Sequence, residues 1–123
     1  MEERMVKMAK SILQESRECV LSGYQGDYLD KHHVFGGANR KRSESMGLWV
    51  YVYKPLHNNS PESIHEDYQL NLMLKKWAQR LCMEHYDMTV EQFIVMFGKN
   101  YLLDDSDYEI NPPFGREFCI NEC

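Results

Sequence analysis

The sequence predicts a single α+β domain in which a two-stranded β-hairpin is followed by a long helix. Its 123 residues, 43% of them hydrophobic, are enough for one packed core and too few for two domains. The clearest strand is residues 48–53, LWVYVY, which are aromatic or β-branched almost throughout. Apolar residues at helical spacing then continue to about Tyr86. We therefore expect a strand–loop–strand–helix unit over residues 28–86, within a domain of residues 1–100.

The first half of the chain predicts one helix and one strand before that clearest strand. Residues 2–17 carry apolar side chains three and four positions apart with charged residues between them, so an amphipathic helix is expected there. Residues 28–35 show mixed alternation and predict a strand that ends near Phe35, where two glycines follow. Residues 38–47 then form a polar, basic loop with room for a single helical turn.

Two further helices are predicted in the second half of the chain. Ser60 has the character of an N-cap because a proline follows it at the first helical position, so the long helix is expected to begin there and to end near Tyr86. A final short helix is expected over residues 89–97. Thr89 and the glutamine three residues later form a capping box, and Gly98 ends the apolar pattern.

The net charge of −5 is concentrated at the C-terminus. Residues 101–123 contain six acidic residues and one basic residue, so the first hundred residues are neutral overall. A negative protein is a poor candidate for DNA binding, which depends on Lys and Arg. Between residues 28 and 60, however, there are five basic residues and only two acidic ones. We therefore expect any anion-binding site to lie in this segment, and residues 101–123 to form an acidic tail.

The sequence predicts a cytoplasmic protein, in the host cytoplasm if a phage encodes it. The first residues lack the apolar run of a signal peptide, and no stretch is apolar for long enough to cross a membrane. A reducing compartment is therefore expected for the four cysteines, none of which forms a Cys-x-x-Cys pair. Cys82 falls at an apolar helical position and is expected in the core.

Four of the five histidines lie within 34 residues of one another: His32, His33, His57 and His65. They follow the order strand, basic loop, strand, helix, so a helix packed across the hairpin would bring His57 close to the adjacent pair. Imidazole is a common metal ligand and, when neutral, a general base near neutral pH. A divalent cation, a histidine base and a nearby basic loop suit the hydrolysis of a phosphodiester.

The same segment resembles a known family. Residues 30–41 (DKHHVFGGANRK), 47–52 (GLWVYV) and 56–58 (LHN) look like the HNH endonuclease-like family, also called ββα-metal or His-Me finger, in its small phage- and prophage-encoded subgroup. Residues 97–101 also look like the end of those proteins, and the resemblance covers about residues 19–101. It implies a ββα-metal finger with flanking N-terminal and C-terminal helices. It also implies a DNA endonuclease or nickase.

The resemblance implies a role for each residue that matches the family motif. His33 matches the general base that activates the attacking water, and Asn39 matches the asparagine that orients this base, although Asn58 competes for that role. A divalent metal, Mg²⁺ or Mn²⁺, would be held by three histidines, the last of which is alternatively a phosphate contact: His32, His57 and His65. DNA phosphates would be contacted by three basic residues: Arg40, Lys41 and Arg42.

The sequence departs from the family pattern in two ways. Relatives often carry a structural zinc on Cys-x-x-Cys pairs, which this chain lacks, so a structural zinc is not expected. The acidic tail, in turn, permits a second function, in which a noncatalytic phage protein on this scaffold binds and inhibits a host defence nuclease, as anti-CRISPR proteins do. The partner surface would then include four acidic residues: Asp104, Asp105, Asp107 and Glu109. A DNA-binding module without turnover is a third interpretation.

Overall fold

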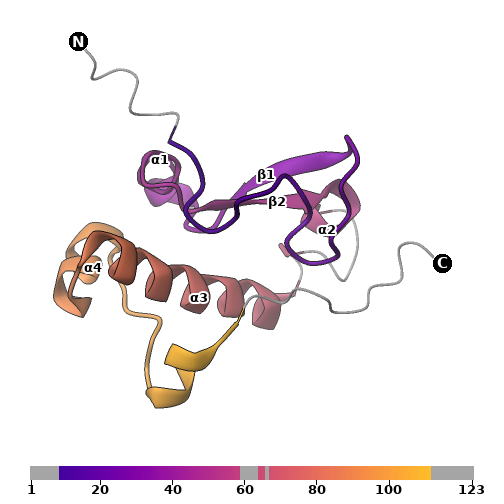
Figure 1. Ribbon diagram of the computed structural model, residues 1–123. Helices are drawn as coiled ribbons and strands as arrows, with labels where there is room; N and C mark the ends of the chain where they lie inside the picture. The colour runs from indigo at the N-terminus through magenta and orange to yellow at the C-terminus, as the bar shows by residue number, and fades with distance from the viewer. Residues whose placement is uncertain (1–8, 59–63, 66, 112–123) are drawn as a thin grey trace, which may run out of the picture.

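The computed structural model describes residues 9–58, 64–65 and 67–111. This part of the chain is a small α+β structure in which an antiparallel hairpin precedes most of the helices (Figure 1). The elements are β1 (Leu29–His33), the 3-10 turn η2 (Gly37–Asn39), α1 (Arg40–Ser45), β2 (Trp49–Tyr53), α2 (Lys54–Asn58), α3 (Tyr68–Tyr86), α4 (Val90–Phe97) and η3 (Asp105–Glu109). None of the described helices is both long and apolar enough to cross a bilayer.

Both predicted strands are present, and they pair with each other. The register places His32 opposite Val50. β1 ends two residues earlier than expected, at His33, although the amide of Val34 still donates to the carbonyl of Leu48 at 3.1 Å. The basic segment between the strands folds into η2 and α1. The buried Ser43 ties this segment to the residue before β2, because its hydroxyl donates to the Leu48 carbonyl at 2.5 Å.

The predicted N-terminal helix is wrong for residues 9–17, which are irregular; residues 2–8 lie outside the described part. This segment instead runs along the outer edge of β2. The Ser11 hydroxyl donates to the Trp49 carbonyl at 2.7 Å, and the Tyr51 amide donates to Gln14 Oε1 at 2.8 Å. Local amphipathic spacing is therefore overridden by hydrogen bonds to a strand that lies 37 and 38 residues further along the chain.

The long helix begins later than predicted. The chain forms the short α2 directly after β2, and α3 then begins at Tyr68, with Asp67 as its N-cap accepting from the Leu70 amide at 3.0 Å. The predicted cap at Ser60 lies outside the described residues, but Ile64 and His65 form a turn rather than a helix. The end of α3 at Tyr86 is confirmed.

Helix α4 is confirmed in both its caps. Thr89 accepts from the Gln92 amide, and the Gln92 side chain accepts from the Thr89 amide at 2.8 Å, which completes the capping box. Gly98 ends the helix with a φ of 89°, a left-handed conformation that glycine adopts without strain.

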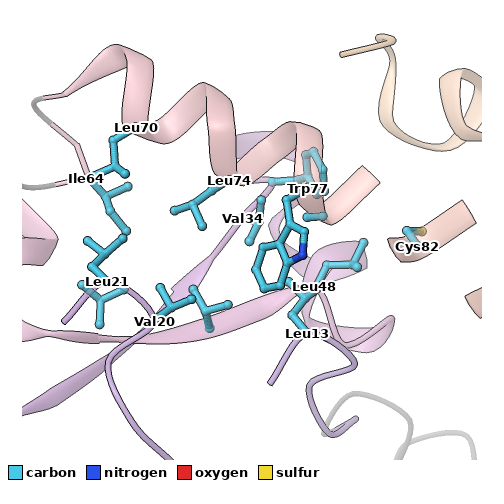
Figure 2. Close-up of a cluster of buried hydrophobic side chains, with 14 of the residues drawn as sticks. Leu13, Val20, Leu21, Val34, Leu48, Ile64, Leu70, Leu74, Trp77 and Cys82 are labelled. Atoms are coloured by element: carbon cyan, nitrogen blue, oxygen red, sulfur yellow. The ribbon is translucent and has the colours of Figure 1, made fainter. Parts of the chain in front are cut away.

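The main core lies between α3 and the hairpin layer (Figure 2). Leu70, Leu74 and Trp77 project from one face of α3, because residues three and four apart share a helix face. They meet apolar residues of the hairpin and of the N-terminal segment: Val34, Leu48, Leu13, Val20 and Leu21. Cys82, on the same helix, is fully buried as predicted. This packing holds the end of β1 against α3.

The beginning of the acidic tail is folded rather than extended. Beyond Tyr101 the chain returns along the face of α3 that is opposite to the hairpin, and this segment includes η3 (Figure 1). Asp107 is buried there. Its carboxylate forms an ion pair with Lys76 at 2.6 Å and accepts from the Leu103 amide at 2.8 Å. These bonds attach the segment to α3.

Replacing Asp107 by asparagine is expected to destabilise the protein at neutral pH. The hydrogen bond from Lys76 and the backbone amides hold the pKa of the Asp107 carboxyl below its ordinary value of 3.8. A lowered native pKa stabilises the fold above pH 3.8, and this contribution disappears as the pH falls through the native pKa. Thermal midpoints of the wild type and Asp107→Asn should therefore differ near pH 7 and converge towards pH 2. The exposed Asp105→Asn serves as the matched control, and an equal effect there would contradict the prediction.

Candidate metal centre

Three histidines converge beside the hairpin. His32 lies on β1, His57 lies on α2 directly after β2, and His65 lies in the turn before α3. The turn is attached to α2 by two backbone bonds, from Ile64 to Leu56 at 2.7 Å and from His65 to His57 at 3.3 Å. The local fold therefore brings together residues that are up to 33 positions apart in the chain.

The three imidazoles are close enough to share one ion. His57 Nε2 lies 3.3 Å from His32 Nδ1 and 3.2 Å from His65 Nε2. One ligand nitrogen from each ring lies within 4.8 Å of the others, and this is the one group of three possible ligands among the described residues. The cluster can hold a metal ion. It contains the three residues that the sequence predicted as ligands.

His57 is oriented by a carboxylate behind it. Its Nδ1 lies 2.9 Å from Asp30 Oδ2, while the other oxygen of Asp30 pairs with Lys54. The hydrogen bond from Lys54 is the main reason that the pKa of the Asp30 carboxyl is lowered; burial opposes it, and His57 adds to it. An ionised Asp30 can accept a hydrogen bond from Nδ1–H of His57, and in that tautomer of the neutral ring Nε2 is the atom that can bind a metal.

His32 is held in the form that binds metals. Its side chain is 4% exposed, and burial lowers its pKa to about 3, with further lowering by His57 and His65. The ring is therefore neutral at pH 7. Its Nε2 atom is buried with no hydrogen-bond partner among the described residues. The neutral imidazole is the form that binds a metal ion.

His33, the predicted general base, is paired with a carboxylate that the sequence analysis missed. Its Nε2 lies 2.6 Å from Glu44 Oε1, and Lys31 holds the other oxygen of Glu44 at 3.0 Å. Burial acts to raise the pKa of Glu44, but the bonds from His33 and Lys31 outweigh it and lower the pKa. Glu44 is therefore ionised at pH 7 and orients the imidazole of His33.

The histidines open into a cavity of about 310 Å³. His32, His33 and His65 line it on one side, together with the loop after β1. Its other lining residues include Asn39, Asn71, Lys75 and Tyr101. The candidate base His33 and two of the three candidate ligands, His32 and His65, therefore face one common space, although His32 and His33 are neighbours in a strand. This is possible because β1 ends at His33 and the chain turns there.

Asn39 lines the same cavity, but it does not contact His33. Its side-chain amide donates to the carbonyl of Phe97 at 3.0 Å and so connects η2 to the end of α4. The side chain that contacts His33 is Glu44, and a role for Asn39 in orienting the base stays a prediction. The side chain of Asn58, the other candidate, lies outside the described part of the structure.

The predicted DNA-contacting residues lie on α1. Arg40, Lys41 and Arg42 are all exposed, and Arg42 also donates to the carbonyl of Met96. Of the acidic residues predicted to bind a partner, Asp105 and Glu109 are exposed. Asp104 is exposed as well and caps η3, whereas the buried Asp107 is used within the chain.

Comparisons with models of protein families, with curated proteins and with solved structures found no match to this chain. The geometry of the described residues therefore carries the functional argument.

Proposed function

We propose that this protein is a metal-dependent DNA endonuclease or nickase with an HNH-like ββα-metal site. One observation carries the proposal: His32 and His65, two of the three histidines that can share an ion, line one cavity with His33, which is paired with Glu44. The order of elements supports it, since a hairpin is followed by a helix that bears His57. The exposed basic residues of α1 lie close by in the chain and suit the DNA backbone.

The donor set bears on which metal is held. The three candidate ligands are all imidazole nitrogens, and Asp30, the carboxylate that contacts His57, is also paired with Lys54. Transition ions such as Zn²⁺ and Ni²⁺ prefer imidazole, whereas Mg²⁺ and Mn²⁺ prefer oxygen ligands. The residues therefore fit a divalent transition ion, and the expectation of Mg²⁺ or Mn²⁺ from the sequence is less favoured by this donor set.

His33 is the residue that moves the proton. If its Nε2–H donates to Glu44, its Nδ1 is unprotonated and can accept a proton from a water in the cavity. The negative charge of Glu44 stabilises the imidazolium that results. When bound, the metal neutralises the scissile phosphate and the charge that develops on the leaving oxygen. Proton transfer and charge neutralisation are then assigned to separate side chains.

The test is cleavage of supercoiled plasmid by metal-stripped protein to which one divalent ion is returned at a time. We expect nicked or linear product with at least one of Zn²⁺, Ni²⁺, Mn²⁺ and Mg²⁺, and none in excess EDTA. His57→Ala should abolish metal-dependent cleavage. His85→Ala is the matched control, because His85 is exposed at the end of α3 and is not part of the cluster.

Failure to cut supercoiled, relaxed and branched DNA with every ion would reject a nuclease. A stable complex with a host nuclease that survives His33→Ala would then support the noncatalytic alternative.

Metal titration by calorimetry provides a second readout. Asp30→Asn should weaken binding about 10- to 100-fold, since carboxylates behind a ligating histidine have effects of that size.

A further inference from the structure

A lysine of α3 reaches the same cavity as the histidines. Lys75 follows the buried Leu74, and its half-buried side chain lines the cavity together with His32, His33 and His65. Lys75 also interacts electrostatically with His32, because its charge contributes to the low pKa of that histidine. Lys75 is therefore a cation close to the candidate catalytic groups.

Lys75 has no acidic partner among the described residues. The other partly buried lysines are each paired with a carboxylate: Lys31 with Glu44, Lys54 with Asp30 and Lys76 with Asp107. Lys75 instead lies over the ring of Tyr101 at 5.6 Å, and Lys99 lies over the same ring at 5.2 Å. Burial and the charge of Lys99 both lower the pKa of Lys75, as expected where two cations meet without an anion.

The wall of the cavity around Lys75 is fixed by the fold. Tyr101 is placed there by the buried Gln79, whose Oε1 accepts from the Tyr101 amide at 2.7 Å and whose Nε2 donates to Asn100 at 2.8 Å. Lys75 therefore lies beside the ring of a residue whose backbone is anchored to α3. Ordered surroundings lower the cost of binding a ligand.

Asn71 adds an unsatisfied polar group to this wall. It lies one helical turn before Lys75 on the same face of α3, because residues four apart are neighbours on a helix. Its Oδ1 is buried and has no hydrogen-bond partner among the described residues. Asn71 lines the cavity, and rotation of its amide would present the Nδ2 donors instead. A ligand in the cavity can satisfy this group.

We propose that Lys75, assisted by Lys99 and Asn71, binds a phosphodiester group of a nucleic acid in the cavity beside His33. An ammonium group can donate hydrogen bonds to phosphate oxygens from many directions, and the substrate would supply the missing counter-ion. Lys75 then acts as a substrate-binding residue that places the backbone against the histidines. This inference rests on the proposed function, and it concerns binding rather than cleavage.

Binding is measured on a background that does not cut. The affinity of His33→Ala protein for a fluorescent 20-base-pair duplex is followed by anisotropy in EDTA, between 50 and 300 mM salt. Adding Lys75→Met should weaken binding about tenfold and reduce the slope of log affinity against log salt by about one, the value for one lost phosphate contact. Lys75→Arg should restore the slope. The exposed Lys10→Met removes the same charge elsewhere and should leave the slope unchanged.

Two outcomes would overturn the inference. One is an unchanged affinity and salt slope in Lys75→Met, with a wild-type circular dichroism spectrum. The other is an equal loss in Lys10→Met, because the effect would then reflect net charge alone. Either can occur while metal-dependent plasmid cleavage is intact, so failure of this inference is distinct from failure of the nuclease itself. A merely structural role for Lys75 would lower the melting temperature without changing the salt slope.

Discussion

Replacing His33 by alanine is expected to reduce DNA cleavage about 10²- to 10⁴-fold without unfolding the protein, because general-base catalysis contributes a factor of that size. His33 lies at the end of β1 and is partly exposed to the cavity, so its loss leaves no large buried void. The three-histidine cluster does not include it, so metal binding should be retained. The rate of plasmid relaxation and the calorimetric metal affinity together provide the measurement.

Glu44→Gln is the informative companion to this variant. The amide oxygen of glutamine can still accept a hydrogen bond from His33 Nε2–H, but it lacks the charge that stabilises the imidazolium. We therefore expect a cleavage rate between those of the wild type and His33→Ala. A His33→Ala protein that cuts DNA at the wild-type rate would show that the base is another group.

Replacing Gly47 by alanine is expected to have the largest effect on stability, at about 2–4 kcal/mol. Gly47 has a φ of 76°, and a non-glycine residue in such a region costs on the order of 1–3 kcal/mol. A Cβ atom there would also lie 2.3 Å from the carbonyl oxygen of Lys10, a backbone atom that has to move. The bond from the Ile12 amide to the Gly47 carbonyl, 2.9 Å long, would be disturbed by this movement.

Gly23→Ala separates the cost of the backbone conformation from the cost of the steric clash. Gly23 has a similar φ of 82°, but a Cβ atom there would meet nothing within 4 Å. Its substitution should therefore cost only the backbone strain, about 1 kcal/mol. Urea unfolding of both variants measures the difference. If Gly47→Ala were no more destabilising than Gly23→Ala, the N-terminal segment would not be held against Gly47 as the structure shows.

Short-range patterns predicted the elements whose stabilising contacts are local. β2 is encoded by its aromatic and β-branched residues, and α4 by the capping box of Thr89 and by Gly98. The N-terminal segment was predicted wrongly because Ser11 and Gln14 bond to a strand that is distant in sequence. Apolar spacing correctly marked Leu13 as buried, but it could not show that the backbone there is irregular.

In the candidate site, too, the sequence revealed the residues that lie in a local pattern and missed those that come together only through tertiary packing. The histidines were found because four of them lie within one short segment. Glu44 and Lys75 were missed because neither stands in a recognisable motif, and each approaches the histidines only after α1 and α3 pack against the hairpin. Asp30 stood within the quoted motif, but its contact with His57 depends on the pairing of β1 with β2.

The N-terminal segment also has a consequence for how the molecules behave together. A hairpin has two open edges, and an open edge is a template on which the strand of another molecule can add. On the outer edge of β2, the Trp49 carbonyl and both backbone groups of Tyr51 are already taken, the last by the Val20 amide at 2.9 Å. Because this segment is irregular, it pairs with these backbone groups of β2 without forming a new strand edge to which another molecule could add. The fold thereby protects the β2 edge of its two-stranded sheet from intermolecular strand addition and aggregation.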